Sequence, residues 1–297
     1  MFDFSKTDMV IYHDPCPDGF ASAAIVSMAI NGHHDVNFIP SAYNEAIPDV
    51  KGKNVLICDF SFTYDIICKM INEAKSFMII DHHKTSEQNL IMVPDINKIF
   101  DMNHAASYLV WKAFFPDRKI PLAITLVEEH DIWKFKSEGV HEFNTMLQIT
   151  PYTFKLFRQL FNEDNIFANE MIKNGKIALQ VMNGNIERLM AASYSAISKI
   201  KINGREKCYN IAYVISSLYK SEIGNLLLKK YPTCDFSVVL HYQQHLNNFE
   251  TLISFRSDDG KTDVSEIAKQ FKGGGHRNAS GAKLSGIYQF IGERPKN

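Results

Sequence analysis

Three short apolar runs in the first third of the chain are each followed by side chains that can bind a metal ion. The runs span residues 9–12, 55–58 and 77–80, and they are followed by His13, by Asp59 and by Asp81-His82-His83. Runs of this length and character are typical of buried strands. Because ligands of open α/β sheets bind beyond the carboxyl ends of the strands, we expect these polar residues to converge on one crevice.

The segments between the apolar runs have the composition of helices. Small and apolar residues fill 20–30, and further helical stretches are predicted at 64–74 and 105–115. Strands that alternate with helices indicate βαβ units and a parallel sheet. The first part of the chain is therefore predicted to be an α/β domain with a parallel sheet, spanning residues 1–185.

The character of the sequence changes after Asn203-Gly204. Before this point, residues 121–200 are predicted to be mostly helical, with a connecting helix or linker at 186–201. After it, strand-like runs surround one helical segment at 220–230. A length of 297 residues also exceeds one average domain. We therefore predict a smaller C-terminal α/β domain at 202–297, with a cleft between the two domains.

Charge, cysteine content and hydropathy restrict the class of protein. The formal net charge is -1, which argues against a dedicated binder of long nucleic acid but leaves a local basic pocket open. The five cysteines form no CxxC pair, which favours a reducing compartment over a disulfide framework. The N-terminus lacks the pattern of a signal peptide, and no uncharged apolar stretch approaches membrane-spanning length. These features predict a cytoplasmic protein with no membrane partner.

Each candidate metal ligand also has an ordinary structural explanation when it is taken singly. A carboxylate and neutral imidazoles suit Mn²⁺, Zn²⁺ or Fe²⁺, yet Asp81-His82-His83 could equally be a polar loop. Asp59 could be a helix N-cap or a turn former, and the HDPCPDG segment (13–19) could be a turn. Asp131, within EEHDIWKF, could be a solvated helix end.

The combination of these residues favours a metal site. The candidates recur at strand or helix ends across one predicted domain, and two divalent ions clamped by shared carboxylates are a known arrangement for phosphoryl transfer. One shared aspartate can bridge both ions and a water molecule. His104 lies close in sequence and is expected to support the site without binding metal. The candidate set is His13, Asp18, Asp59, His82 and Asp131.

A second cluster of chemically suggestive residues lies near the C-terminus. Gly273, Gly274 and Gly275 would let the backbone approach a ligand closely, and exposed N–H groups with a helix start just beyond would form an anion site. His276 and Arg277 add donors for phosphate. The alternative is a flexible linker, but linkers are more often rich in Gly and Ser. Arg256, at a predicted strand end, could also reach an anion or could simply be an exposed edge arginine.

The ordered set of motifs resembles the DHH phosphoesterases that carry the DHH-associated C-terminal domain. This family includes the RecJ nucleases, the nanoRNases and cyclic-dinucleotide phosphodiesterases. The three letters DHH are a weak signal alone, but the set appears in the order of the family from His13 to Gly281. The matching segments are HDPCPDG, ICDFS, IIDHHKT, NHAAS, EEHDIW and GGGHRNASG.

The resemblance implies a role for each matching residue. Asp81 would support the site, His83 would face the metal and the phosphate as a catalytic residue, and Asp59 would bridge the ions. In the second domain, His276 with its glycines matches the motif that grips the substrate, and Arg256 matches the arginine that often precedes it. The residues implied as metal ligands are His13, Asp18, Asp59, His82 and Asp131.

The chain departs from the family at Cys16. Many members have paired aspartates in the first motif, as DxD, and here the position two before Asp18 is a cysteine. A thiolate is a softer ligand than manganese prefers. The departure puts the first metal site in doubt: it could be weaker, could use His13 with water, or could favour another metal.

The resemblance also implies an activity, a cofactor and a substrate. The expected reaction is hydrolysis of phosphodiester bonds in short oligonucleotides or small nucleotides by a metal-activated water. The expected cofactor is a pair of Mn²⁺ ions, with Mg²⁺ or another divalent ion as alternatives. Alternative activities are a phosphatase on a small nucleotide or polyphosphate, and a catalytically impaired nucleotide sensor. A homodimer is left open by the sequence.

Overall fold

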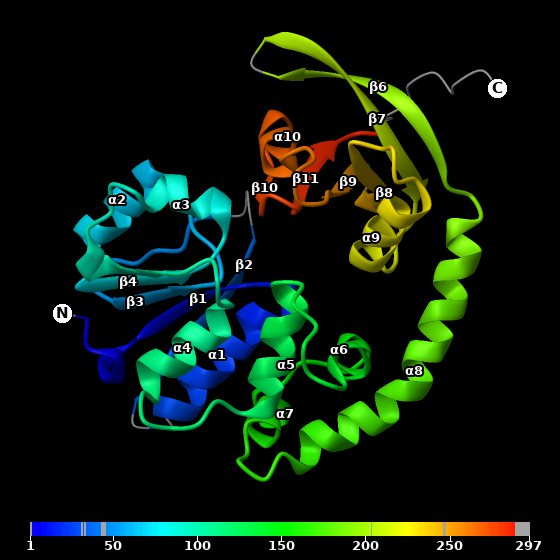
Figure 1. Cartoon of the computed structure of the whole chain (residues 1–297). Helices are drawn as coiled ribbons and strands as arrows, with labels where there is room; N and C mark the ends of the chain where they lie inside the picture. Colours follow the sequence, from blue (N-terminus) through cyan, green and yellow to red (C-terminus); the bar gives the residue numbers. More distant parts are fainter. Residues whose placement is uncertain are drawn as a thin grey trace. The chain divides into compact units, whose positions relative to one another are not determined.

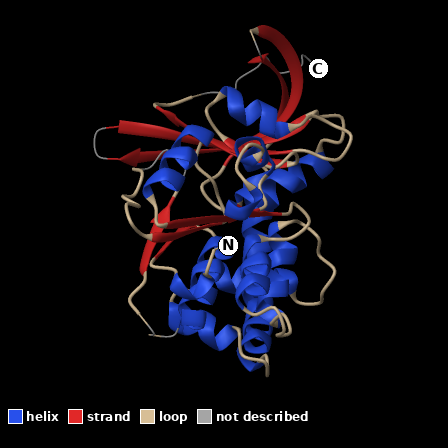
Figure 2. Cartoon of the chain, turned by 90° about the vertical axis from the view of Figure 1, so that its left-hand side faces the viewer, coloured by secondary structure: helices blue, strands red, loops and turns tan. Residues whose placement is uncertain are grey.

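The computed structural model describes residues 2–30, 32, 34–42, 46–202, 204–245 and 248–288. The chain divides into two compact units, Met1–Gln180 and Val181–Asn297. Each unit contains its own sheet with helices against it (Figure 2). The predicted α/β class, with a parallel sheet first and a separate second domain, is confirmed.

The first unit is built on a five-stranded sheet in the order β2-β1-β3-β4-β5, and every neighbouring pair is parallel. Two of its strands were not expected from the sequence. Both lie at an edge, one is interrupted by Pro40 and the other has only three residues, so neither gives a strong apolar signal. The strands are β1 (Met9–His13), β2 (Asn37–Ser41), β3 (Asn54–Cys58), β4 (Ser76–Asp81) and β5 (Lys98–Phe100).

Helices cover both faces of this sheet, with α1 and α4 on one face and α2 and α3 on the other (Figure 1). Alternate residues of the central strands supply the two cores: Leu56 packs toward α1, while Ile57 packs toward α2. The small side chains of Ala21, Ala23 and Ala24 are fully buried and bring α1 close to the sheet. The helices are α1 (Pro17–Ile30), α2 (Tyr64–Glu73), α3 (Lys84–Leu90), α4 (Ala106–Phe114), α5 (Leu122–Asp131), α6 (Val140–Gln148) and α7 (Phe154–Leu160).

The long helix α8 (Ile166–Met190) continues from the first unit into the second. The predicted connecting segment at 186–201 is therefore only partly helical, because β6 (Tyr194–Ile202) occupies its second half and belongs to the second sheet. Ala196 and Ile200 are buried while Lys199 is exposed, and this period of two is that of a strand. Among the described residues, no helix combines the length and the apolar character that crossing a bilayer requires.

The second unit contains a six-stranded mixed sheet in the order β10-β11-β9-β8-β7-β6. Only β7 and β8 pair in parallel. Helix α9 (Lys220–Lys230) packs on β8 and β9, where Ser237 Oγ donates a hydrogen bond to the carbonyl of Gly224. Helix α10 (Val264–Gln270) packs on the other face with Val238 and Leu240, which alternate with Ser237. The remaining strands are β7 (Arg205–Ile215), β8 (Phe236–His245), β9 (Asn248–Arg256), β10 (Gly274–Gly275) and β11 (Ala279–Ser285).

Candidate metal centre

The sheet topology brings the three strand ends together. Strand β1 pairs with β2 on one side and with β3 on the other, so the strand order reverses between β1 and β3. Such a switch point leaves a crevice at the carboxyl ends of the strands. His13 is the last residue of β1, Asp59 follows β3, and Asp81 is the last residue of β4. The three apolar runs at 9–12, 55–58 and 77–80 therefore end next to one another at one edge of the sheet.

Asp59 links two histidines from different strands. Its Oδ2 lies 3.3 Å from His13 Nδ1 and its Oδ1 lies 3.2 Å from His82 Nε2. Asp59 has a φ of 66°, in the left-handed region that aspartate visits more readily than most residues and that marks strained functional positions. Its N–H donates to the carbonyl of Ile80 at 3.0 Å, which fixes this turn beside β4. The carboxylate is therefore held between the two rings.

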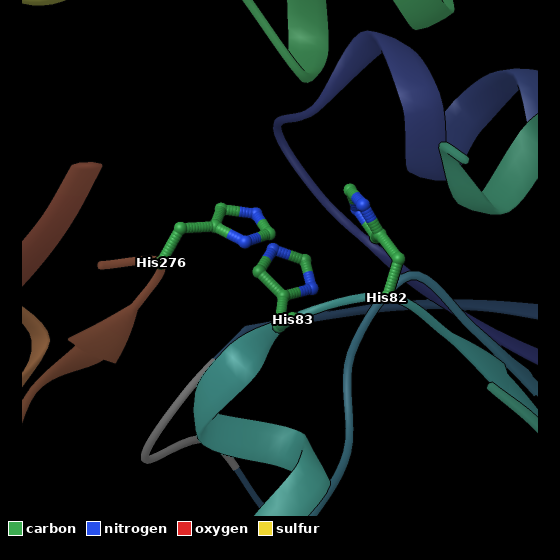
Figure 3. A group of neighbouring side chains, drawn as sticks. All are labelled: His82, His83 and His276. Atoms are coloured by element: carbon green, nitrogen blue, oxygen red, sulfur yellow. The ribbon is translucent and has the colours of Figure 1, made fainter. Parts of the chain in front are cut away.

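His82 is buried among three carboxylates. Its Nε2 lies 3.2 Å from Asp59 Oδ1, 3.4 Å from Asp131 Oδ2 and 3.8 Å from Asp18 Oδ2. The ring projects from the connection between β4 and α3, next to that of His83 (Figure 3). Asp18, Asp59 and His82 are inaccessible to solvent, whereas the side chain of Asp131, at the end of α5, is 25% exposed.

Asp18 is held by the N-terminus of α4. Its two carboxylate oxygens accept hydrogen bonds from the N–H groups of Ala106 (2.8 Å) and Ser107 (2.9 Å), and the Ser107 hydroxyl donates to it as well. The helix terminus offers unsatisfied N–H groups and a favourable dipole for a carboxylate. His104 lies next to the same helix terminus, and its Nδ1 is 2.7 Å from Glu128 Oε1. The same Glu128 oxygen accepts a hydrogen bond from the Ala105 N–H.

Asp81 orients the two histidines that follow it. Its Oδ1 accepts hydrogen bonds from the His82 N–H at 2.7 Å and from the His83 N–H at 3.2 Å, and it lies 2.7 Å from His83 Nδ1. Burial opposes ionisation of Asp81, but the nearby rings of His83 and His82 together with a hydrogen bond from Ser86 lower the pKa of this carboxyl. Asp81 thus positions the His83 ring and leaves Nε2 as the ring nitrogen outside that contact.

The electrostatics of the cluster show an excess of negative charge. Burial, followed by repulsion from neighbouring carboxylates, raises the pKa of Asp18 well above its usual range. Burial opposes ionisation of Asp59 too, but hydrogen bonds with His13 and His82 hold its pKa well below its usual range. Burial disfavours a charged His82 ring, yet the surrounding carboxylates raise its pKa to about 10. Added positive charge would therefore be stabilised here.

The residues present fit divalent cations. Asp131 Oδ2 is buried and accepts no hydrogen bond from any residue that the structure describes, and its contact with His82 Nε2 at 3.4 Å places it beside another potential ligand atom. Carboxylates with neutral imidazoles are donors that Mn²⁺, Fe²⁺ and Zn²⁺ accept. Within this unit the ligand atoms of each group lie within 4.8 Å of one another: His13, Cys16 and Asp59; Asp18, His82 and Asp131; and Asp59, Asp81, His82 and His83.

Close packing between two strands explains why glycine occupies positions 273 and 275, and the sequence did not indicate this packing. A Cβ on Gly273 would lie 2.0 Å from the Gly281 carbonyl oxygen, and one on Gly275 would lie 2.6 Å from that of Ala279. The expected helix start beyond the motif is wrong: β11 follows it, and α10 precedes it. The glycines therefore let β10 pack closely on β11, and Gly274 and Gly275 pair with that strand.

The other candidate residues of the second unit differ in whether a backbone group or a side-chain group forms the hydrogen bond. His276, labelled in Figure 3, begins the turn between β10 and β11, where its N–H donates to the Ala279 carbonyl at 2.7 Å. Arg277 donates to the Lys261 carbonyl at 2.9 Å and lies 3.6 Å from Asp263 Oδ2. Arg256, the last residue of β9, donates to Ser221 Oγ at 2.6 Å.

Two contributors to the first-unit cluster were missed as functional residues. Ser107 lies within the NHAAS motif, and its contact with Asp18 joins residues 89 positions apart in the chain. Cys16 departs from the aspartate of the family motif, yet its sulfur belongs to a group of potential ligand atoms with His13 and Asp59. Its spacing within HDPCPDG was the available signal.

Comparisons with known proteins give a consistent result. No protein-family model matches the chain. The uncharacterized protein R106 of Acanthamoeba polyphaga mimivirus is 33% identical over 301 residues, covering 97% of this chain and 70% of that protein. Oligoribonuclease NrnB of Bacillus subtilis is 25% identical over 232 residues, covering 72% of this chain and 55% of NrnB. The crystal structure of RecJ from Thermus thermophilus with Mn²⁺ aligns with a TM-score of 0.50 and 11% identity, over 93% of this chain and 49% of RecJ.

These similarities relate the chain to phosphodiesterases. The first unit carries buried clusters of carboxylates and imidazoles, which suit that class of enzyme. The family follows from the relatives together. The chain belongs to the DHH phosphoesterase family, which confirms the resemblance expected from its motifs.

Proposed function

We propose that this protein is a metal-dependent phosphoesterase that hydrolyses phosphodiester bonds of short oligonucleotides or small nucleotides. The observation that carries the proposal is the position of Asp59, whose two oxygens face His13 on one side and His82 on the other. A carboxylate in that position can be shared by two ions, as two-metal hydrolases require. The excess of buried negative charge around His82 supports the same conclusion.

The proposed ligands are His13, Asp18, Asp59, His82 and Asp131, for Mn²⁺ or another divalent ion. When bound, such ions would polarise a phosphoryl oxygen and lower the pKa of a coordinated water. The protein itself would hold the ligands in place, and the N-terminus of α4 fixes Asp18 in this way. That support is needed because displacement of reacting groups by about 1 Å can reduce the rate a hundredfold.

His83 is the proposed residue for proton transfer. Asp81 accepts a hydrogen bond from Nδ1–H of its ring, so Nε2 would take up a proton and, with the ring then an imidazolium, donate it to a phosphoryl oxygen or to the leaving alkoxide. Asp81 would set the tautomer of that ring, as a carboxylate partner commonly does for a functional histidine. Asp81 thus acts through His83 and serves as a positioning residue.

The second unit is the proposed substrate-binding domain. Arg256 and His276 are cationic or donor side chains suited to phosphate, and Gly273–Gly275 precede the turn that carries His276. Arg277, which the sequence places in the same set, is hydrogen-bonded to the Lys261 carbonyl, and we propose that it holds this turn in place. The formal net charge of -1 favours a short or small substrate over long nucleic acid. The oligoribonuclease relative NrnB makes short RNA the first substrate to examine.

The proposal is tested by incubating the purified full chain with Mn²⁺ and a panel of substrates. The panel contains a labelled dinucleotide, a five-residue RNA, a cyclic dinucleotide, pAp and polyphosphate, each with an EDTA control. Asp59→Asn should abolish metal-dependent turnover, whereas Asp117→Asn, an exposed aspartate between α4 and α5, should leave it unchanged.

The outcome of the panel distinguishes the alternatives. Cleavage of the dinucleotide or RNA that EDTA abolishes supports the proposal. Turnover confined to pAp or polyphosphate would replace it with the phosphatase alternative. Binding of nucleotide without turnover of any substrate, in protein that retains no metal, would favour the impaired sensor.

A further inference from the structure

Cys16 lies in the one position of the first motif where this chain replaces the expected aspartate. Its sulfur, a ring nitrogen of His13 and a carboxylate oxygen of Asp59 all lie within 4.8 Å of one another. Two segments of the chain supply these residues: His13 and Cys16 lie three positions apart between β1 and α1, and Asp59 comes from the turn after β3. The fold therefore brings Asp59 to a pair of residues that are already close in sequence.

The local backbone holds the thiol at this edge of the sheet. The Cys16 carbonyl accepts the Phe20 N–H at 3.0 Å in the first turn of α1. A Cβ on Gly19 would lie 2.2 Å from the His13 carbonyl oxygen, so glycine is required for α1 to begin this close to β1. The segment that carries Cys16 is thus packed against the residue that carries the His13 ring.

The donor set of this group differs chemically from that of its neighbour. The group of Asp18, His82 and Asp131 offers two carboxylates and one imidazole, whereas the group of His13, Cys16 and Asp59 offers one carboxylate, one imidazole and one sulfur. Carboxylates suit harder ions such as Mn²⁺ and Mg²⁺, while thiolate favours Zn²⁺ and other softer ions. Zn²⁺ accepts Cys, His and Asp together.

We propose that Cys16 Sγ is a metal ligand in this group and makes the position selective for Zn²⁺ or Co²⁺ over Mn²⁺. The inference rests on the proposed metal centre and specifies the ion that one half of it takes. On binding, a sulfur–metal bond forms, the thiol proton is released to solvent, and no electron is transferred. The pair of positions is then chemically unequal, with a harder and a softer site that share Asp59.

The test is a titration of the metal-free full chain with Co²⁺, followed by absorption spectroscopy. A thiolate ligand gives a sulfur-to-cobalt charge-transfer band in the near ultraviolet, which oxygen and nitrogen ligands do not. We expect the band in the wild type and in Cys208→Ser, which removes an exposed thiol of the second unit. We expect Cys16→Ser to lose it.

A second measurement compares metal preference. In Cys16→Asp, the ratio of the Kd for Zn²⁺ to the Kd for Mn²⁺ should rise by about tenfold or more, because a harder ligand replaces a softer one. An unchanged ratio would count against Cys16 as a ligand. Circular dichroism of each variant shows whether the fold is intact, and Cys16→Ala replaces Cys16→Ser in the charge-transfer measurement if the serine variant fails to fold.

Equilibrium dialysis separates failure of this inference from failure of the metal centre. Cobalt that binds the wild type, is lost in Asp59→Asn and gives no charge-transfer band would overturn the role of Cys16 while leaving the centre in place. A charge-transfer band that persists in Cys16→Ser would also overturn it. No cobalt binding to the wild type would overturn both proposals.

Discussion

Asp18 and Ser107 are joined by two hydrogen bonds, one from the backbone N–H of Ser107 at 2.9 Å and one from its hydroxyl. Because Ser107 lies in the first turn of α4 and Asp18 in the first turn of α1, the contact joins the N-terminus of α4 to a carboxylate carried by α1. The Asp18 oxygens are thereby fixed before any ion binds. Such preorganisation is what a metal site with several carboxylates needs from its surroundings.

Replacing Ser107 with alanine should weaken metal binding without unfolding the protein. The variant keeps the backbone N–H bond to Asp18 but loses the hydroxyl bond, and loss of an outer hydrogen bond to a metal ligand lowers affinity by about 10-fold to 100-fold. Isothermal titration calorimetry with Mn²⁺ measures the change. Ser22→Ala is the matched control, because the buried Ser22 hydroxyl has no hydrogen-bond partner among the described residues. Equal affinities in the two variants would contradict the role given to Ser107.

Asp59→Asn should remove turnover while preserving the local backbone. Asparagine is nearly isosteric with aspartate and tolerates the φ of 66° that this position adopts. Loss of the shared charge should lower kcat by at least about 10³-fold, since metal-ion stabilisation is worth several kcal/mol. Asp59→Ala should lose turnover too and also melt at a lower temperature, since alanine is less tolerant of this backbone. Near-normal kcat in either variant would contradict the metal-ligand assignment.

Metal removal should lower the melting temperature of the protein. The buried carboxylates near His82 repel one another, and a bound cation relieves that repulsion. At an ion concentration 100 times the Kd, binding to the native state contributes about 2.7 kcal/mol, which is a shift of roughly 5 to 11 °C for a unit of this size. Differential scanning calorimetry with and without EDTA measures it. Asp131→Asn should show a smaller shift, and an EDTA effect of equal size in both proteins would place the ion elsewhere.

The sequence predicted the parts of the fold whose signals are local. The central strands β1, β3 and β4 each contain an apolar run, and the predicted runs agree with the strands to within one residue at each end. Strand β2 was missed because it is half exposed and contains Pro40. Strand β6 differs from the helix that the sequence predicts there, because exposed Ile197 and buried Ser198 obscure the period of two.

The site could be predicted only where residue type and strand ends coincide. His13, Asp59 and His82 follow or end buried strands, so the sequence alone brought them to one edge. The hydrogen bonds from the N-terminus of α4 to Asp18 depend on the packing of two helices, and no local sequence pattern indicates them. The glycines at 273–275 were predicted to let the backbone approach a ligand, and the structure adds that Gly273 and Gly275 allow close approach of a neighbouring strand, which the sequence did not indicate.

Gly19→Ala should destabilise the first unit and disturb the metal centre. The new Cβ would lie 2.2 Å from the His13 carbonyl oxygen, which is backbone and cannot move aside cheaply. We expect a loss of about 1–3 kcal/mol, as for other overpacked sites. Gly184→Ala is the control: this glycine lies within α8 with nothing within 4 Å of its Cβ position, and alanine should stabilise by about 0.5–1 kcal/mol. Thermal melts show whether each variant is more or less stable than the wild type. A stabilised Gly19→Ala protein would contradict the close contact between position 19 and the His13 carbonyl.

His276→Ala and Arg277→Ala should have different effects although the two residues are adjacent. Arg277 is engaged by the Lys261 carbonyl and lies near Asp263, so its loss should lower stability by up to about 1 kcal/mol and change KM little. The backbone N–H of His276 forms the hydrogen bond of the turn, and this bond is kept in His276→Ala. Loss of the imidazole side chain should therefore raise KM and leave kcat nearly unchanged, as for a group that binds ground state and transition state alike.

Steady-state kinetics on whichever substrate the panel identifies, together with thermal melts, separate the two roles. A raised KM in Arg277→Ala at normal stability would restore this arginine to the substrate-binding set proposed from the sequence. A fall in kcat in His276→Ala with KM unchanged would instead place His276 among the residues that act in the transition state, which would require the second unit to contribute to chemistry as well as to binding.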